Sequence, residues 1–182
     1  GIPDLAVAAG RNGGPRVTIW DGKNVAAAPG AGTPAQPPLA NAFVFEDTQR
    51  DGAFVTLGDV TSDGKADLIA GGGPNGGPRV RIGDMAPILT AKNFGTFDSQ
   101  LGVVKSNFFA GDPNTRGGIR VSARDIDGDG IADLVTGSGD GLPTQVQYFK
   151  GTRLVTFTGG VQAGDQTLDP FSTTLAGGVY VG

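Results

Sequence analysis

Hydrophobic and polar residues alternate along short segments of this chain, and glycine or proline separates one segment from the next. In the clearest segment, Val17 and Ile19 alternate with Arg16 and Thr18. A period of two predicts a β-strand with one buried face. The 33 glycines and 12 prolines disfavour long helices, because glycine inside a helix costs about 1 kcal/mol relative to alanine and proline about 3. The pattern predicts an all-β protein of short strands and tight turns.

Three kinds of segment recur along the chain. A strand that starts with Asp-Leu and enters a glycine-rich turn begins at Asp4, Asp67 and Asp133. The strand before it has the forms DGAFVTLGDV from Asp51, GGIRVSARDI from Gly117 and GGVYVG from Gly177. Aromatic segments are AFVFED from Ala42, NFFAGD from Asn107 and DPFSTT from Asp169. Self-similarity at a near-constant spacing is typical of repeat architectures.

Each repeat is predicted to contain four strands. Strand one resembles GGIRVSARDI, strand two DLVTGSG and strand three PRVTIWDG, and strand four is the aromatic segment. Four antiparallel strands per repeat are typical of a β-propeller blade. We expect β-propeller-type repeats with about three blades in a single repeat domain, residues 1–182. The first repeat begins at strand two of a split blade and ends at about residue 46. The second and third repeats cover about 47–112 and 113–176, and residues 177–182 form the closing strand of the split blade.

The segment DIDGDGIADL, from Asp125 to Leu134, has acidic residues at alternate positions and a glycine at the sixth. Calcium prefers six to eight oxygen ligands, and loops with this spacing supply them from positions 1, 3, 5, 7 and 9. The predicted ligands are the side chains of Asp125, Asp127, Asp129 and Asp133 and the carbonyl of Ile131. Carboxylates this close repel one another without a cation, so calcium is favoured over an ordinary metal-free turn or a catalytic role.

A second loop, DVTSDGKADL, fits the same frame. Its predicted ligands are the side chains of Asp59, Thr61, Asp63 and Asp67 and the carbonyl of Lys65. A hydroxyl replaces one carboxylate here, so we expect weaker binding, and a metal-free turn is a stronger alternative than in the first loop. The strand-like residues that follow both loops distinguish them from helix-flanked calcium loops.

These motifs together resemble the FG-GAP, or integrin-α-like, propeller repeats, most closely those of large secreted bacterial proteins. The resemblance rests on D-x-D-x-D-G-x-x-D-L, G-x-G and G-G-P-R-V-x-I-x-D-G, with F-x-x-x-D-x-x-x-x-G-G-I-R-V ahead of them. It covers nearly the whole chain and implies that the calcium loops join strands one and two of a blade. The third repeat departs from the pattern at Leu142–Gln145 and at Gln162–Asp169.

Composition excludes several classes of function. A net charge of −4 is unsuited to sequence-independent nucleic-acid binding. The chain has no histidine and no cysteine, which removes the commonest general base and the thiol nucleophile, so we expect no enzyme and no catalytic residues. Asp47, Asp98 and Asp112 belong to turn-like segments. The sequence has neither a signal peptide nor an apolar run of about 18 residues, so we expect no membrane insertion and interpret it as a mature or excised piece.

We expect a non-catalytic, calcium-stabilised structural or adhesive protein that is secreted or at the cell surface. The partners are other copies or further blades, with a glycan or a cell-surface protein as further options. Three arrangements are open: a ring of two chains, one part of a longer propeller, or a head-to-tail fibre in which GGVYVG completes the GIPDL blade of the next copy.

The alternative is a carbohydrate-binding propeller domain of a secreted polysaccharide-active protein. Trp20, Tyr148 and Tyr180 are candidates for stacking on a sugar, although core or inter-blade packing is the favoured role for Trp20 and Tyr148. The segment Ala26–Pro38 is interpreted as a proline-rich surface loop that acts as a spacer or carries a glycan.

Overall fold

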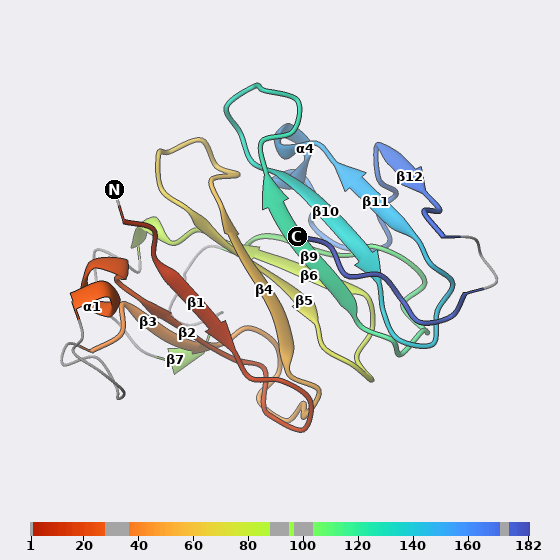
Figure 1. Cartoon of the computed structure of the whole chain (residues 1–182), viewed down its shortest axis with the longest axis horizontal. Coiled ribbons are helices and arrows are strands. Elements are labelled where there is room, and N and C mark those ends of the chain that lie inside the picture. The colour runs from red at the N-terminus through yellow and green to blue at the C-terminus, as the bar shows by residue number, and fades with distance from the viewer. Residues whose placement is uncertain (1, 28–36, 88–94, 97–103, 172–174) are drawn as a thin grey trace.

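The computed structural model describes residues 2–27, 37–87, 95–96, 104–171 and 175–182 (Figure 1). The first sheet has the order β1 (Leu5–Ala8), β2 (Arg16–Trp20), β3 (Ala40–Phe43) and β7 (Gly95–Thr96). The second has β4 (Ala53–Gly58), β5 (Asp67–Gly72), β6 (Arg79–Gly83) and β8 (Val104–Phe109). The third has β9 (Ile119–Arg124), β10 (Asp133–Ser138), β11 (Val146–Phe149) and β12 (Gln166–Leu168).

The all-β prediction and the propeller-like blades are confirmed, although the three sheets do not close into a ring. The described helices are short: α1 (Gly22–Ala27) and α4 (Gly151–Leu154). Both follow strand three of their blade. Helix α1 includes the start of the proline-rich segment, and residues 28–36 of that segment lie outside the described residues.

Strand four of the first blade is β3, in the aromatic segment where it is expected. Strand β7 adds an outer strand to this sheet and pairs parallel to β3, with Ala42 opposite Gly95. In the third blade, residues 169–171 of the expected aromatic segment are not in a strand, so the prediction of strand four is wrong for the described part of that segment. Strand β12 takes the position instead, with Gln166 opposite Tyr148, while Phe171 is 60% exposed. The backbone pairing of β12 needs no apolar alternation, so the sequence pattern did not reveal it.

Two hydrophobic clusters lie between neighbouring sheets. Between the second and third sheets, Phe108 packs against Phe149 and Phe157 with ring centroids 5.5 and 4.9 Å away. Strand β5 contributes to both clusters, with Ile69 in this one and Leu68 and Ala70 in the cluster between the first and second sheets. The side chains of a central blade are therefore buried on both faces.

Strand one of the second blade and of the third blade lies over strand two of the blade before it. The amide of Ala53 at the start of β4 donates to the carbonyl of Ala9 at 3.1 Å. A Cβ at Gly71 in β5 would meet the carbonyl of Ile119 in β9, so only glycine permits this close approach. The same backbone contact therefore recurs from blade to blade.

Residues 177–182, expected to close the split blade, form no strand with β1 in this chain. They lie instead on the third blade. The amide of Val179 donates to the carbonyl of Ser138 at 2.9 Å, and a Cβ at Gly137 would meet the Val179 carbonyl. This segment thus lies on the third blade as β9 lies on the second.

Candidate metal centre

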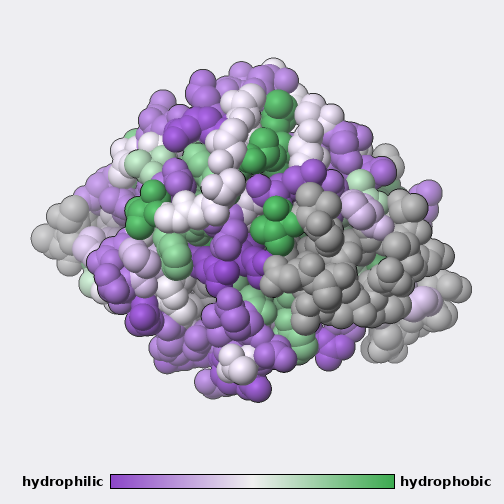
Figure 2. Space-filling model, turned by 180° about the vertical axis from the view of Figure 1, so that it is seen from behind, coloured by the Kyte–Doolittle hydropathy of each residue, from purple (hydrophilic) through white to green (hydrophobic). Residues whose placement is uncertain are grey.

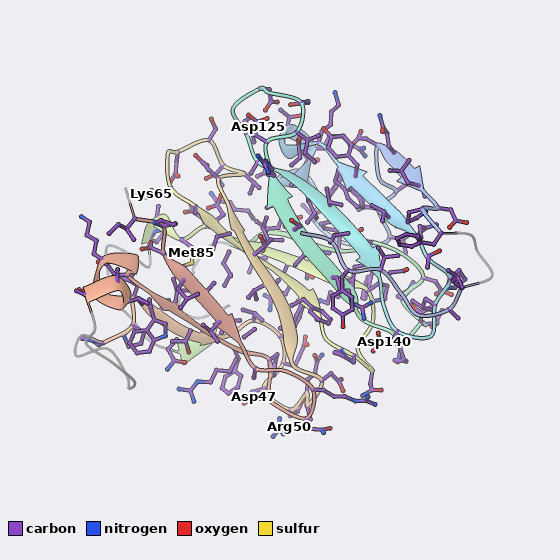
Figure 3. The ribbon with its side chains drawn as sticks, in the orientation of Figure 1. Asp47, Arg50, Lys65, Met85, Asp125 and Asp140 are labelled. Carbon is purple, nitrogen blue, oxygen red and sulfur yellow. The ribbon has the colours of Figure 1, made fainter. Side chains whose placement is uncertain are left out.

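The two acidic loops connect strands one and two of their blades. Residues 59–66 join β4 to β5, and residues 125–132 join β9 to β10. Both loops lie at the same edge of the molecule, as the labels on Lys65 and Asp125 show in Figure 3. Asp47, Arg50 and Asp140 lie at the opposite edge.

Three carboxylates of the 125–133 loop come together. One oxygen from each of Asp125, Asp127 and Asp133 lies within 4.8 Å of the others. Asp125 and Asp127 are exposed, whereas Asp133 is fully buried. An all-oxygen set of this charge suits a hard divalent cation such as calcium.

Backbone amides fix these side chains in the loop. The two oxygens of Asp125 accept hydrogen bonds from Gly128 at 2.7 Å and Gly130 at 3.0 Å. Asp129 is not part of the three-carboxylate group, and its carboxylate accepts from the Ile131 amide at 2.8 Å. A carboxylate has about four lone-pair sites, so the two hydrogen bonds to Asp125 leave room for a cation on that side chain.

Asp133 is also held from the neighbouring strand β11 and helix α4. Its Oδ1 accepts from the amide of Gly151 at 2.7 Å, and its Oδ2 accepts from the Tyr148 hydroxyl at 3.1 Å. Burial and this hydrogen bond raise the pKa of Tyr148, so its hydroxyl remains a donor. Lys150 Nζ lies 3.7 Å from Asp127 Oδ2 and partly balances the negative charge.

The sequence reasoning did not identify Tyr148, Lys150 and Gly151 as partners of the loop. For Tyr148, the sequence indicates only packing or stacking on a sugar. These residues could be identified from the antiparallel pairing of β10 with β11. In this pairing Leu134 lies opposite Phe149, which places the neighbours of Phe149 beside Asp133.

The 59–67 loop repeats this backbone pattern. Asp59 accepts from the amides of Asp63 at 3.2 Å and Gly64 at 2.8 Å, and Asp63 accepts from the Lys65 amide at 2.9 Å. The other end of the loop is fixed by Asp67, whose Oδ2 accepts from the amides of Val60 and Thr61, both at 3.0 Å. Hydrogen bonds from backbone amides thus fold the loop around its carboxylates without a bound ion.

Two oxygens of this second loop are buried without a hydrogen bond: Oδ1 of Asp67 and Oγ1 of Thr61. Burial raises the pKa of the Asp67 carboxyl, and the hydrogen bonds from Val60 and Thr61 only partly oppose it. Unpaired buried oxygens are costly, and each calls for a partner such as an ion. The residues present therefore fit a cation here as well.

The third blade shows why the Asp67 oxygen lacks a partner. The equivalent oxygen of Asp133 accepts a hydrogen bond from the amide of Gly151. A Cβ at Gly151 would lie 2.7 Å from the carbonyl oxygen of Ala132, so a larger residue could not approach as closely. In the first blade, Asp4 Oδ1 likewise accepts from Gly22 at 3.0 Å. The second blade has the bulkier, buried Met85 at this position.

The comparison with protein families identifies one segment of the chain. Residues 117–152 match the FG-GAP repeat model. The matched segment contains β9, the 125–133 loop, β10 and β11, so the resemblance drawn from the motifs is confirmed there. FG-GAP repeats often bind calcium, are typical of extracellular proteins and are generally non-catalytic. No curated protein and no solved structure matches the chain.

A cavity of about 340 Å³ lies among the loops that join the second blade to its neighbours. Its lining includes Phe45, Phe109, Asp51, Arg79 and Arg116. Neither Trp20 nor a carboxylate of the acidic loops lines it. Among the described helices, none is long and apolar enough to cross a membrane.

Proposed function

We infer that the chain is a non-catalytic structural module that works outside the cell and is stabilised by calcium. The observation that carries this proposal is the convergence of Asp125, Asp127 and Asp133 within 4.8 Å in the segment that matches the FG-GAP repeat. The unpaired oxygens of Thr61 and Asp67 support a second site.

Calcium would supply charge neutralisation at the joint between strands one and two. In the first loop, Asp125, Asp127 and Asp133 would hold it, with Asp129 and the Ile131 carbonyl as the further predicted ligands. In the second loop, the predicted ligands are Asp59, Thr61, Asp63 and Asp67 and the Lys65 carbonyl. Extracellular calcium modules bind at about 10⁻⁴–10⁻³ M, which suits an ion that stabilises structure outside the cell.

The structural or adhesive role follows from the repeat architecture and from the absence of histidine and cysteine. The partners we propose are other copies of the chain or further blades, with a cell-surface protein or glycan as the target of adhesion. The secreted or cell-surface location rests on the FG-GAP match and on the affinity range expected of calcium modules.

Thermal unfolding in CaCl₂ and in EGTA tests the calcium role. A ligand present at 100 times its Kd stabilises the folded state by about 2.7 kcal/mol, so calcium should raise the Tm. Asp125→Asn with Asp127→Asn should remove most of this increase. Asp47→Asn, at the opposite edge, is the matched control and should retain it. A wild-type Tm that is equal in CaCl₂ and EGTA would exclude calcium stabilisation.

Carbohydrate binding is the second candidate, and the 340 Å³ cavity favours it. Phe109 offers an aromatic ring for sugar stacking, and Arg116 and Asp51 offer polar groups. Glycan-array binding that is lost in Phe109→Ala and kept in Trp20→Phe would support this site. Absence of binding to any glycan would reject it.

A further inference from the structure

The two acidic loops are joined to each other by a backbone hydrogen bond. The amide of Ala132 in the 125–133 loop donates to the carbonyl of Asp59 in the 59–67 loop at 2.8 Å. Asp59 is a predicted ligand of its loop, and Ala132 lies between two predicted ligands, the Ile131 carbonyl and Asp133. One hydrogen bond therefore connects the two candidate cation sites across the boundary between the second and third blades.

The contact between the loops is buried and closely packed. Val60, which follows Asp59, is 2% exposed, and Ala132 is 9% exposed. Both belong to the hydrophobic cluster between the second and third sheets. A Cβ at Gly58 would lie 2.9 Å from the Cβ of Ala132, so glycine is needed for this close approach. A hydrogen bond in such surroundings is electrostatically stronger than one in water.

The rest of the surface differs from this junction. On the face opposite to Figure 1, the described residues are largely hydrophilic or neutral, and hydrophobic residues form separate patches (Figure 2). The apolar side chains beside the two loops are instead buried between blades. The contact between the loops is therefore part of the interior that holds the second and third blades together.

The segment 131–132 has little room to move independently of its neighbours. On its other side, a Cβ at Gly151 would lie 2.7 Å from both the Ala132 carbonyl oxygen and the Ile131 side chain. The segment is therefore held between Asp59 and the start of helix α4. Because closely packed interiors transmit displacement, a shift of the Ile131 carbonyl would move the Ala132 amide and the Asp59 carbonyl with it.

The position of the Asp59 backbone matters for the 59–67 loop. The Asp59 carboxylate accepts from the amides of Asp63 at 3.2 Å and Gly64 at 2.8 Å. These bonds require the first residue of the loop to keep a fixed position relative to its turn. The bond from Ala132 fixes the other side of Asp59, at its carbonyl. The 59–67 loop is therefore ordered in part by the 125–133 loop.

We propose that a cation bound in the 125–133 loop strengthens cation binding in the 59–67 loop through the hydrogen bond from Ala132 to Asp59. This inference rests on the proposed calcium function and adds a coupling between its two sites. When the Ile131 carbonyl and Asp133 hold an ion, the Ala132 amide between them is fixed. The 59–67 loop then loses less conformational entropy when it binds its own ion. Because coupling is reciprocal, each site strengthens the other by the same factor.

Removal of the Ala132 N–H tests the coupling. Replacement of Ala132 by L-lactic acid turns this amide into an ester, which deletes the donor and keeps the methyl side chain. Calcium is titrated into the isotope-labelled chain, and two backbone amides are followed by NMR. Gly64 reports on the 59–67 loop because it donates to Asp59, and Gly130 reports on the 125–133 loop because it donates to Asp125.

The ester is compared in two backgrounds, wild type and Asp125→Asn with Asp127→Asn, in which the 125–133 site is disabled. In wild type, the ester should weaken calcium binding at Gly64 about fivefold, as expected from the loss of one hydrogen bond. In the disabled background the same ester should change binding at Gly64 by less than about twofold, because no ion fixes Ala132 there. This non-additivity isolates the coupling.

The matched control is the same ester at Ala66, the equivalent residue of the 59–67 loop. The Ala66 amide donates no hydrogen bond to a described residue, so this ester should leave binding at Gly64 unchanged. A loss as large as that of the Ala132 ester would overturn the proposal. Independently of any ester, binding at Gly64 should be weaker in the disabled background than in wild type, and equal binding would also overturn it.

The outcomes separate the coupling from the calcium function. Equal losses at Gly64 in the two backgrounds would overturn the coupling and leave both calcium sites in place. If neither Gly64 nor Gly130 responds to calcium in the wild-type chain, the calcium function and the coupling both fail.

Discussion

The amide of Gly151 donates to Oδ1 of Asp133 at 2.7 Å, and this contact distinguishes the third blade from the second. In the second blade Met85 replaces the glycine, and the corresponding oxygen of Asp67 is buried without a hydrogen bond. Two aspartates at equivalent positions therefore have different roles. Asp133 stabilises the 125–133 loop without a bound ion, whereas Asp67 needs a cation or a proton to offset its buried negative charge.

The substitutions Asp133→Asn and Asp67→Asn should have different effects in EGTA. Asp133→Asn replaces an oxygen that accepts from a buried donor by an amide, and should lower the free energy of unfolding by about 2–3 kcal/mol. Asp67→Asn removes an unpaired buried charge and should be neutral or stabilising. Urea unfolding monitored by circular dichroism measures both. A larger loss for Asp67→Asn would contradict the assignment of roles.

The raised pKa of Asp67 predicts a pH dependence of the calcium-free protein. A carboxyl whose pKa is higher in the folded state favours folding when protonated. Its contribution is complete below the unfolded pKa of about 3.9 and is lost as the pH rises through the folded pKa. In EGTA, the unfolding free energy of wild type relative to that of Asp67→Asn should therefore fall as the pH rises from about 3.9 through the folded pKa. A constant difference would disprove the shift.

Lys150 competes with a cation for the charge of Asp127. Because the ammonium group lies 3.7 Å from Oδ2 and is half exposed, its pairing energy is about 0–1 kcal/mol. We expect Lys150→Met to lower the Kd for calcium by roughly twofold to fivefold. Isothermal titration calorimetry measures the Kd, with Lys23→Met as the control. A weaker affinity in Lys150→Met would show that the lysine does not compete.

A methyl group at Gly137 should release the C-terminal segment from the third blade. In Gly137→Ala the new Cβ would collide with the Val179 carbonyl, and the hydrogen bond from Val179 to Ser138 would break. Because one such bond contributes about 1 kcal/mol, we expect hydrogen exchange of the Val179 amide to accelerate roughly fivefold or more. Gly10→Ala is the control, since a Cβ there meets no atom within 4 Å. Unchanged exchange in Gly137→Ala would contradict the contact.

The strands with clear alternation and the two acidic loops could be predicted from the sequence. Val17 and Ile19 are both buried in β2, as the period of two indicates. Strand β12 could not be predicted, because it is held by backbone pairing with β11 and all three of its residues are exposed.

Spacing placed Asp125, Asp127 and Asp133 correctly in one loop. It could not show that Asp129 binds the Ile131 amide instead of joining the three-carboxylate group, because this depends on the local turn. The support of Asp133 by Tyr148 and Gly151 depends on tertiary pairing between β10 and β11, as does the effect of Met85 on Asp67.

Strand β4 belongs to two blades, since its edge pairs with β5 and its start is bonded to Ala9. Strand β9 joins the second and third blades in the same way. Removing one blade therefore breaks hydrogen bonds and exposes apolar surface in its neighbour. The three repeats should therefore unfold in a single cooperative transition and not as independent units. A force applied to the two ends of the chain would be resisted by all three sheets together.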